Sequence, residues 1–320
     1  MSELLKRYLE RRHIDRNDKA VSGLFPSLGA YLRSRKVWKR LQNKAHHQRH
    51  EGHPTTIHIS GYEGKNKTAQ TIQHYLQTHK HPAIKAAFVQ GSIADCEETA
   101  FSDFDGILLI DPAEIYSASQ LRVLHKIVHK TAHLMKKMDP LQHHGWSVLL
   151  STELNRYPDA QLPSLLLEKS KCLYPSTGFS VTIKVDPAHQ DYSILYEDLC
   201  QGIYKRSAQE STLQQFYYSK LFISECLLLP AAFLQALNKK PIWKKDSFEL
   251  IQQHLPARHL ETIAAVEKIR AEWSTYYQGQ AKKQKPDIQL SSQLQSLFPA
   301  MKALIDEMDR ILKAHQAIRV

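Results

Sequence analysis

One segment constrains the fold of this chain more than any other: an apolar run, a Gly-Ser pair and, ten residues later, two aspartates at the start of a second apolar run. The first run extends from Ile84 to Val89 and is followed by Gly91-Ser92. The second, Phe104 to Ile110, has Asp103 and Asp105 at its start. Short runs rich in aliphatic side chains are typical of buried strands. The segment therefore predicts two core strands whose polar ends carry chemistry.

The polar residues of this segment suit a phosphate and a divalent cation. Gly91 permits close backbone approach, and Ser92 offers a hydroxyl and an amide N–H to a phosphate. Asp103 and Asp105 are two apart, so on an extended strand they share a face while Phe104 points into the core. Two adjacent carboxylates repel each other without a cation. Hard oxygen ligands at this separation suit Mg²⁺, which also bridges phosphate oxygens.

The composite pattern resembles the signature of the DNA polymerase β-like nucleotidyltransferase superfamily. Val89 to Ile107 matches it in residue type, order and spacing, except that Gly106 directly follows the second aspartate. The resemblance implies an α/β (α+β) fold with a mixed-sheet catalytic core that transfers a nucleoside monophosphate from a triphosphate to an acceptor. It also implies two Mg²⁺ ions on three carboxylates. Gly91 and Ser92 would hold the triphosphate, and Asp103 and Asp105 would be catalytic metal ligands.

The sequence departs from the family pattern at the third carboxylate. The family places this acid on the strand after the helix predicted over 118–137, but the segment 143–150 contains no acid. His144 or Ser147 occupies the family position, and we expect His144 to act as the catalytic base because imidazole titrates near neutral pH. The alternatives for a displaced acid are Asp139, Glu153 and Asp186.

The C-terminal half reads as helices only, from about residue 190. In the family that the chain resembles, a helical domain packs beside the cleft and sends basic residues to the triphosphate. The nucleotide-binding candidates expected from this half are Lys220, Ser224, Lys244 and Ser247. Ser247 or Asp246 is also expected to cap the helix that starts there, leaving N–H groups for phosphate.

Composition limits the partners and the compartment. The 320 residues include 43 Lys and Arg against 32 Asp and Glu, a net charge of +11, so the surface attracts polyanions. The four cysteines are widely spaced, which argues against a disulfide framework, and the chain start is too charged for a signal peptide. The sequence has no stretch of 18 apolar residues, so we expect no membrane span. We therefore expect a cytoplasmic protein that does not bind membranes.

The predicted organisation has three parts: a basic helical extension over 1–60, a nucleotidyltransferase catalytic core over 61–190 and a helical domain over 191–320. The expected function is Mg²⁺-dependent, ATP- or other NTP-using nucleotidyl transfer to RNA, a small molecule such as an aminoglycoside, or a protein hydroxyl. The basic extension favours RNA. One alternative is a catalytically weakened module that senses nucleotides or binds a partner, as in a toxin–antitoxin pair. Another, from charge alone, is a simple RNA-binding protein.

Overall fold

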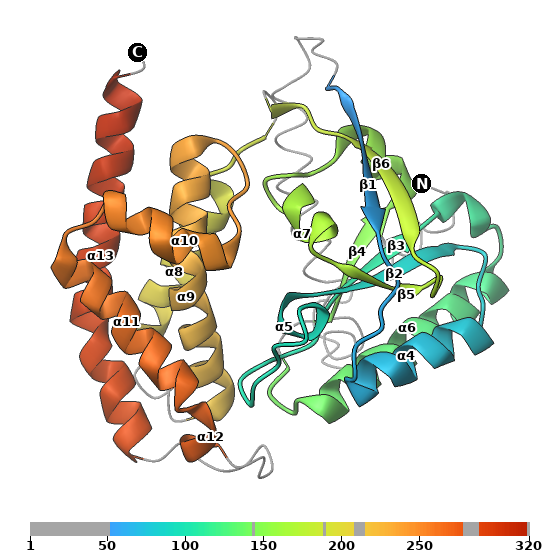
Figure 1. Ribbon diagram of the computed structural model, residues 1–320, viewed down its shortest axis with the longest axis horizontal. Helices are drawn as coiled ribbons and strands as arrows, with labels where there is room; N and C mark the ends of the chain where they lie inside the picture. The colour runs from blue at the N-terminus through green and yellow to red at the C-terminus, as the bar shows by residue number, and fades with distance from the viewer. Residues whose placement is uncertain (1–51, 143–144, 188–189, 208–214, 278–287, 319–320) are drawn as a thin grey trace. The chain divides into compact units, whose positions relative to one another are not determined.

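The computed structural model describes residues 52–142, 145–187, 190–207, 215–277 and 288–318, and Figure 1 shows their helices and strands. The chain divides into two compact units. The first contains the chain up to Pro158 together with Leu166–His189. The second contains Asp159–Leu165 and the chain from Gln190 onward. Most of the basic extension expected over 1–60 lies outside the described residues.

A four-stranded mixed sheet forms the centre of the first unit, in the order β4-β3-β2-β5. β2 pairs antiparallel with both β3 and β5, whereas β3 and β4 are parallel. The strands are β2 (Ile84–Gln90), β3 (Asp105–Ile110), β4 (Trp146–Leu150) and β5 (Lys171–Tyr174). The shorter helical elements of this unit are α5 (Gly91–Ala94), η1 (Pro112–Glu114) and η2 (Ser151–Arg156), and α7 (Ser164–Glu168) crosses the unit boundary.

Two helices cover one face of this sheet: α4 (Lys67–Thr78) and α6 (Ala118–Met138) (Figure 1). Asn66 caps α4 by accepting hydrogen bonds from two backbone N–H groups, and Ser117 caps α6 in the same way through one. α6 is the crossover that the parallel pair β3 and β4 requires. Every second residue of β3, including Leu108 and Ile110, joins the apolar core beneath the helices. The intervening residues, including Asp105, therefore face the other side of the sheet.

A two-stranded antiparallel ribbon lies apart from the main sheet. It consists of β1 (Pro54–Ile59) and β6 (Phe179–Lys184). The residues just after β1 are hydrogen-bonded to β5, because the Tyr62 N–H donates to the Cys172 carbonyl over 2.8 Å. The helical reading of the extension up to residue 60 is therefore wrong for β1. The alternation of apolar residues in β1 is too short to predict a strand directly after the polar segment that precedes it.

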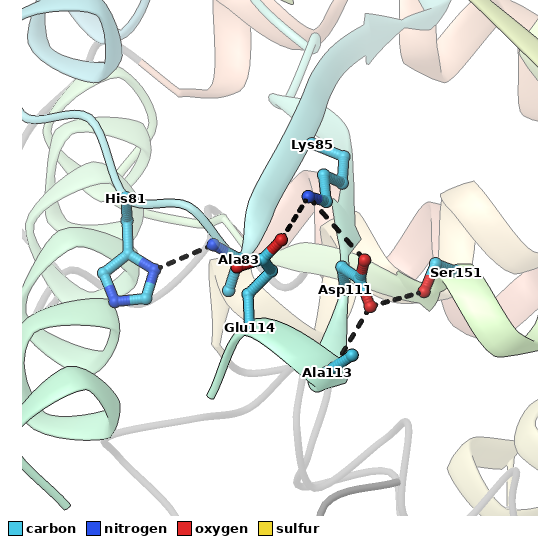
Figure 2. Close-up of polar contacts among 7 residues, drawn as sticks. All are labelled: His81, Ala83, Lys85, Asp111, Ala113, Glu114 and Ser151. Atoms are coloured by element: carbon cyan, nitrogen blue, oxygen red, sulfur yellow. Dashed lines mark hydrogen bonds and ion pairs between the residues drawn. The ribbon is translucent and has the colours of Figure 1, made fainter. Parts of the chain in front are cut away.

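A polar cluster closes the sheet at the end where β2 begins and β3 ends (Figure 2). The Lys85 ammonium lies 3.0 Å from a Glu114 carboxylate oxygen and 3.7 Å from Asp111. The hydrogen bond to Glu114 raises the pKa of Lys85. Asp111 also accepts hydrogen bonds from the Ala113 N–H and the Ser151 hydroxyl. These contacts join β2, β3 and the segment after β4 at one end of the sheet.

His81 joins α4 to α6 as a neutral imidazole. It is 4% exposed; Nδ1 accepts from the Ala83 N–H over 3.2 Å, and Nε2 lies 3.0 Å from the Gln120 carbonyl, to which it must donate. Protonation would put a second proton opposite the Ala83 N–H. Burial is the main cause that lowers the pKa of His81 below its ordinary 6.5.

We expect the stability of the first unit to fall as the pH drops below the ordinary histidine pKa. Because the folded pKa is lowered, the unfolded chain binds the proton first, so His81 stabilises the fold above that pKa and loses this contribution as the pH falls. Thermal unfolding followed at pH values on both sides of the ordinary pKa measures the effect. The non-titrating His81→Gln variant should lose less Tm on acidification than the wild type. An equal loss in both would contradict the role of His81.

The second unit is helical and is built around α9 (Phe216–Asn238), whose buried residues lie on all sides. By length and composition α9 passes as a membrane span, but 67% of its apolar window is buried in the protein, as in the core helix of a bundle. The surrounding helices are α8 (Ile194–Ser207), α10 (Lys244–Leu250), η5 (Ile251–Gln253), α11 (Ala257–Ala271), α12 (Trp273–Tyr276) and α13 (Ile288–Ile318). The expected α/β fold with a mixed sheet and a helical C-terminal half is confirmed.

Candidate functional site

The Gly-Ser corner lies against the second aspartate. β2 ends at Gln90, which pairs with Asp105 at the start of β3, so Gly91 leaves the sheet beside that carboxylate. Gly91 has φ +67°, a left-handed conformation that an L side chain rarely adopts. A Cβ there would lie 3.4 Å from Asp105 Oδ2. The left-handed backbone, rather than a lack of room, therefore favours glycine at this corner beside the carboxylate.

Ser92 ties the corner to the loop that precedes Asp103. The corner is the first turn of the short helix α5. The Ser92 hydroxyl donates to Ser102 Oγ over 2.9 Å, and Ser102 Oγ also accepts from the Thr99 N–H over 2.9 Å. The ten-residue loop between the two parts of the motif therefore folds back on the corner. The structure brings Gly91, Ser92 and the aspartate pair together at one end of the sheet.

The two aspartates are held through the residue between them. Asp103 and Asp105 are both partly exposed, whereas Phe104 is fully buried. The pairing of β3 begins at Asp105, so the expectation that the strand starts at Phe104 is one residue early. The Phe104 N–H donates to Gln142 Oε1, and Gln142 Nε2 donates to the Phe104 carbonyl, each over 2.8 Å. The Gln142 side chain thus binds this residue as a neighbouring strand would.

Gln142 is the residue that sequence reasoning missed. It is 6% exposed and stands 38 positions from Phe104 in the chain. Nothing in its local pattern distinguishes it from any polar residue before a strand. Its function as a clamp depends on the parallel alignment of β3 and β4, which brings the loop before β4 beside the aspartates.

Gly106, which departs from the family pattern, makes room for Trp146. The two residues pair across β3 and β4, and a Cβ on Gly106 would lie 2.6 Å from Trp146 Cζ3. The buried indole N–H donates to Thr131 Oγ1 over 2.8 Å, and the ring meets Phe104 edge-on at 6.1 Å between centroids. The tryptophan therefore packs directly beneath the aspartate pair.

Replacing Gly106 by alanine should destabilise the protein by about 1–3 kcal/mol, because the added methyl overlaps a rigid ring. Denaturant unfolding measures this free energy. Trp146→Leu removes the clash, so Gly106→Ala should cost less in that background, as a double-mutant cycle would detect. Strictly additive costs would show that the indole does not require the glycine.

Ser147 and Leu149 are the residues of β4 that share a face with Asp105, and Ser147 is the polar one. Gly106 pairs with Trp146 and Ile107 with Ser147 in parallel register, so the odd-numbered residues of both strands face the same side. Ser147 is exposed, and Trp146 is buried. His144, the expected base, lies outside the described residues. Ser147 is thus the position on this strand from which a polar side chain reaches the aspartate face.

The displaced acids do not supply an evident third ligand. Glu153 accepts from the Leu150 N–H over 2.9 Å, at the end of β4 away from the aspartates. Asp139 is 8% exposed and accepts from the Leu141 N–H over 2.9 Å. Asp186 follows β6. Among the described residues no group of three or more His, Cys, Asp or Glu side chains is placed to hold a metal ion.

The donor set at the aspartates nevertheless fits one hard cation. Asp103 and Asp105 bring two carboxylates to the same sheet end, and Gly91 adjoins Asp105. Carboxylate oxygens suit Mg²⁺, which also binds phosphate and water at its other coordination positions. The described residues thus account for two of the three carboxylates that the resemblance implies.

The candidates from the helical half differ in their exposure. Lys220 is 1% exposed and Ser247 is fully buried, while Ser224 and Lys244 are partly exposed. α10 begins after Trp243 without a side-chain cap, and the Ser247 hydroxyl donates to the Lys244 carbonyl over 2.6 Å. The expectation that Ser247 or Asp246 caps this helix is wrong, because both residues lie within the helix and the Ser247 hydroxyl is directed to a carbonyl.

Comparison with known proteins finds likenesses among solved structures. No family model matches the chain, and no curated protein matches it. Among solved structures, it is similar to spectinomycin adenyltransferase AAD(9) from Enterococcus faecialis, determined with ATP and spectinomycin. The sequences are 11% identical, the match covers 74% of this chain and 98% of that one, and the TM-score is 0.38.

Proposed function

We propose that this chain is a Mg²⁺-dependent nucleotidyltransferase. The observation that carries the proposal is the Gly91-Ser92 corner lying against Asp105, with Asp103 two residues earlier, at one end of a mixed sheet. The described geometry supports a place where a triphosphate meets paired carboxylates. The proposal takes its reaction class from the motif and the fold together.

In the proposed reaction an acceptor hydroxyl oxygen attacks the α-phosphorus of a nucleoside triphosphate. A new phosphorus–oxygen bond forms, the bond to the bridging oxygen breaks, and pyrophosphate leaves with the bonding electrons. Gly91 and Ser92 bind the triphosphate through their backbone N–H groups, while the Ser92 hydroxyl holds the loop through Ser102. Asp103 and Asp105 would hold Mg²⁺, which supplies positive charge to the phosphate oxygens. The proton of the acceptor passes to His144 in this proposal.

The alternative is a weakened member that binds nucleotide without efficient turnover. The observation that favours it is that no group of three or more His, Cys, Asp or Glu side chains in the described part of the chain is placed to hold a metal ion. The acceptor in the leading proposal is RNA, a small molecule or a protein hydroxyl. Lys220, Ser224, Lys244 and Ser247 remain proposed nucleotide contacts, of which the buried Lys220 and Ser247 would need a rearrangement to reach one.

The test incubates the full chain with α-labelled nucleoside triphosphates, Mg²⁺ or Mn²⁺, and three acceptors in turn: total RNA, an aminoglycoside and the protein itself. Transfer of label to one of them with release of pyrophosphate supports the enzyme. Saturable triphosphate binding without transfer supports the weakened module. If the chain neither binds a triphosphate nor transfers label, both the enzyme and the weakened module are excluded.

Ser147→Asp should tighten Mg²⁺ binding in the presence of a non-hydrolysable triphosphate by about tenfold, equivalent to about 1.4 kcal/mol. The new carboxylate would enter on the face that Asp105 occupies and add charge to the ligand set. Titration calorimetry measures this without requiring turnover. The uncharged, nearly isosteric Ser147→Asn is the matched control. Equal affinities in the two variants would place the missing ligand elsewhere.

A further inference from the structure

The two helices that cover the sheet contain no acidic residue. Neither α4 nor α6 has an Asp or a Glu in its 12 and 21 residues. Exposed basic side chains gather on their solvent side, which we call the basic face. Its members are Lys67, Arg122, Lys126, Lys130 and Lys137, with His129 and His133 among them.

The basic residues of α6 form one continuous line. Arg122, Lys126, Lys130, His133 and Lys137 follow one another at intervals of three or four residues, which places them on one side of the helix. At 1.5 Å per residue this line is about 22 Å long. The opposite side of α6 is buried in the core beneath the sheet.

α4 runs antiparallel to α6 and extends the face. Asn66, just before α4, lies 3.6 Å from the Met138 sulfur at the end of α6, and His81, after α4, meets Gln120 near the start of α6. Lys67 is therefore at the Lys137 end of the line. In Figure 1 the two helices run side by side beneath the sheet.

The charges of the basic face are not neutralised within the described parts of the chain. Among the described residues, no member of the basic face takes part in an ion pair, unlike Lys85, Arg206 and Arg310. Arg122 with Lys126, and Lys126 with Lys130, are like-charge pairs four residues apart, which destabilise a helix. A surface selected for helix stability alone would alternate charges along this line.

We propose that the basic face is a docking surface for the phosphodiester backbone of a duplex nucleic acid. A line of cations about 22 Å long matches about six base pairs at 3.4 Å each, so several phosphates meet a cation at once. The surface lies on the helical side of the sheet, whereas Asp105 faces the other side. It is therefore separate from the proposed nucleotidyltransfer site and does not depend on that function.

A membrane is the less fitting anionic partner. Stable membrane binding by a basic helix needs apolar side chains that enter the acyl region. The apolar side of α6 is committed to the core, and Val123 is the one large apolar side chain exposed on α4 or α6 within the described residues. Phosphate contacts alone suffice for nucleic-acid docking, because counterion release provides the affinity.

The test measures binding of the full chain to labelled RNA and DNA duplexes of about 20 base pairs, roughly three times the length of the line, by fluorescence anisotropy over a salt series. The test variant carries Arg122→Gln, Lys126→Gln and Lys130→Gln. The control removes the same charge from exposed lysines of the helical unit, through Lys268→Gln, Lys302→Gln and Lys313→Gln. Unfolding curves check that both triple variants fold.

We expect the test variant to bind at least about tenfold more weakly, with a log–log salt slope shallower by about 2.7, three times the value of 0.9 for each phosphate contact. The control should change neither quantity as much. A stronger effect on one duplex identifies RNA or DNA as the source of the backbone. The proposal would be overturned by equal losses in both variants or by the absence of duplex binding in the wild type. It would also be overturned if binding to phosphatidylserine vesicles depended on these residues and duplex binding did not.

Discussion

Asp103→Asn and Asp105→Asn should each lower the rate of nucleotidyl transfer by about 1,000-fold or more. Loss of a carboxylate that holds the metal removes several kcal/mol of transition-state stabilisation, and each 1.36 kcal/mol is a factor of ten. Both side chains are partly exposed, which argues that the fold will persist, and removal of carboxylate repulsion should keep metal-free stability equal or raise it. Single-turnover kinetics with labelled triphosphate, together with thermal unfolding, measure the two effects.

The matched control for the aspartate variants is Asp111→Asn, at the opposite end of the same strand. Asp111 belongs to the polar cluster with Lys85 and Ser151 (Figure 2). The same change of charge there should alter stability slightly and leave transfer nearly intact. Wild-type rates in Asp103→Asn and Asp105→Asn would end the assignment of the site, whatever the control does.

Gln142→Met should reduce transfer by about 100-fold, because displacement of reacting groups by about 1 Å costs that much. Methionine keeps the length of the side chain but releases the N–H and the carbonyl of Phe104, and so lets the aspartates on either side move. The Mg²⁺ concentration for half-maximal rate should rise. Gln142 acts here as a positioning residue. The control is Gln120→Met, which removes a glutamine that accepts from the Tyr116 N–H away from the aspartates.

Gln142→Glu separates positioning from simple stability. An ionised glutamate still accepts from the Phe104 N–H, but its second oxygen repels the Phe104 carbonyl. Burial raises the pKa of such a carboxyl, and the protonated acid donates as the amide does. The rate of this variant relative to the wild type should therefore increase as the pH falls. A pH-independent ratio would mean that the two hydrogen bonds do not position the aspartates.

The elements with strong periodic patterns were predictable from sequence. The helix predicted over 118–137 is α6, whose Leu124, Val128 and Met135 repeat at helical spacing, and the strand predicted after it is β4. Gly91, Ser92, Asp103 and Asp105 were singled out by type and spacing, and the pairing of β2 with β3 accounts for their proximity. The local sequence pattern was enough to predict this part of the site, because the motif residues lie at the ends of the two strands that pair.

The elements that depend on distant partners were not predictable. β5 has four residues, so its place at the sheet edge follows only from its pairing with β2. β1 is stabilised as a strand by β6, which lies more than 100 residues away. The same holds for Gln142, whose backbone partner is set by tertiary alignment. Non-local pairing overrides weak local preference in each case.

The division of the chain has a consequence for its synthesis. The backbone passes between the units three times, because Asp159–Leu165 belongs with the helices although Leu166–His189 returns to the sheet. Asp159 accepts from the Tyr192 hydroxyl over 2.9 Å, and the Ala160 carbonyl accepts from the Gln235 side chain over 3.1 Å. On the ribosome, Asp159 and Ala160 emerge long before these partners. The short segment must therefore wait until α9 has been made, and no single cut of the chain yields both units whole.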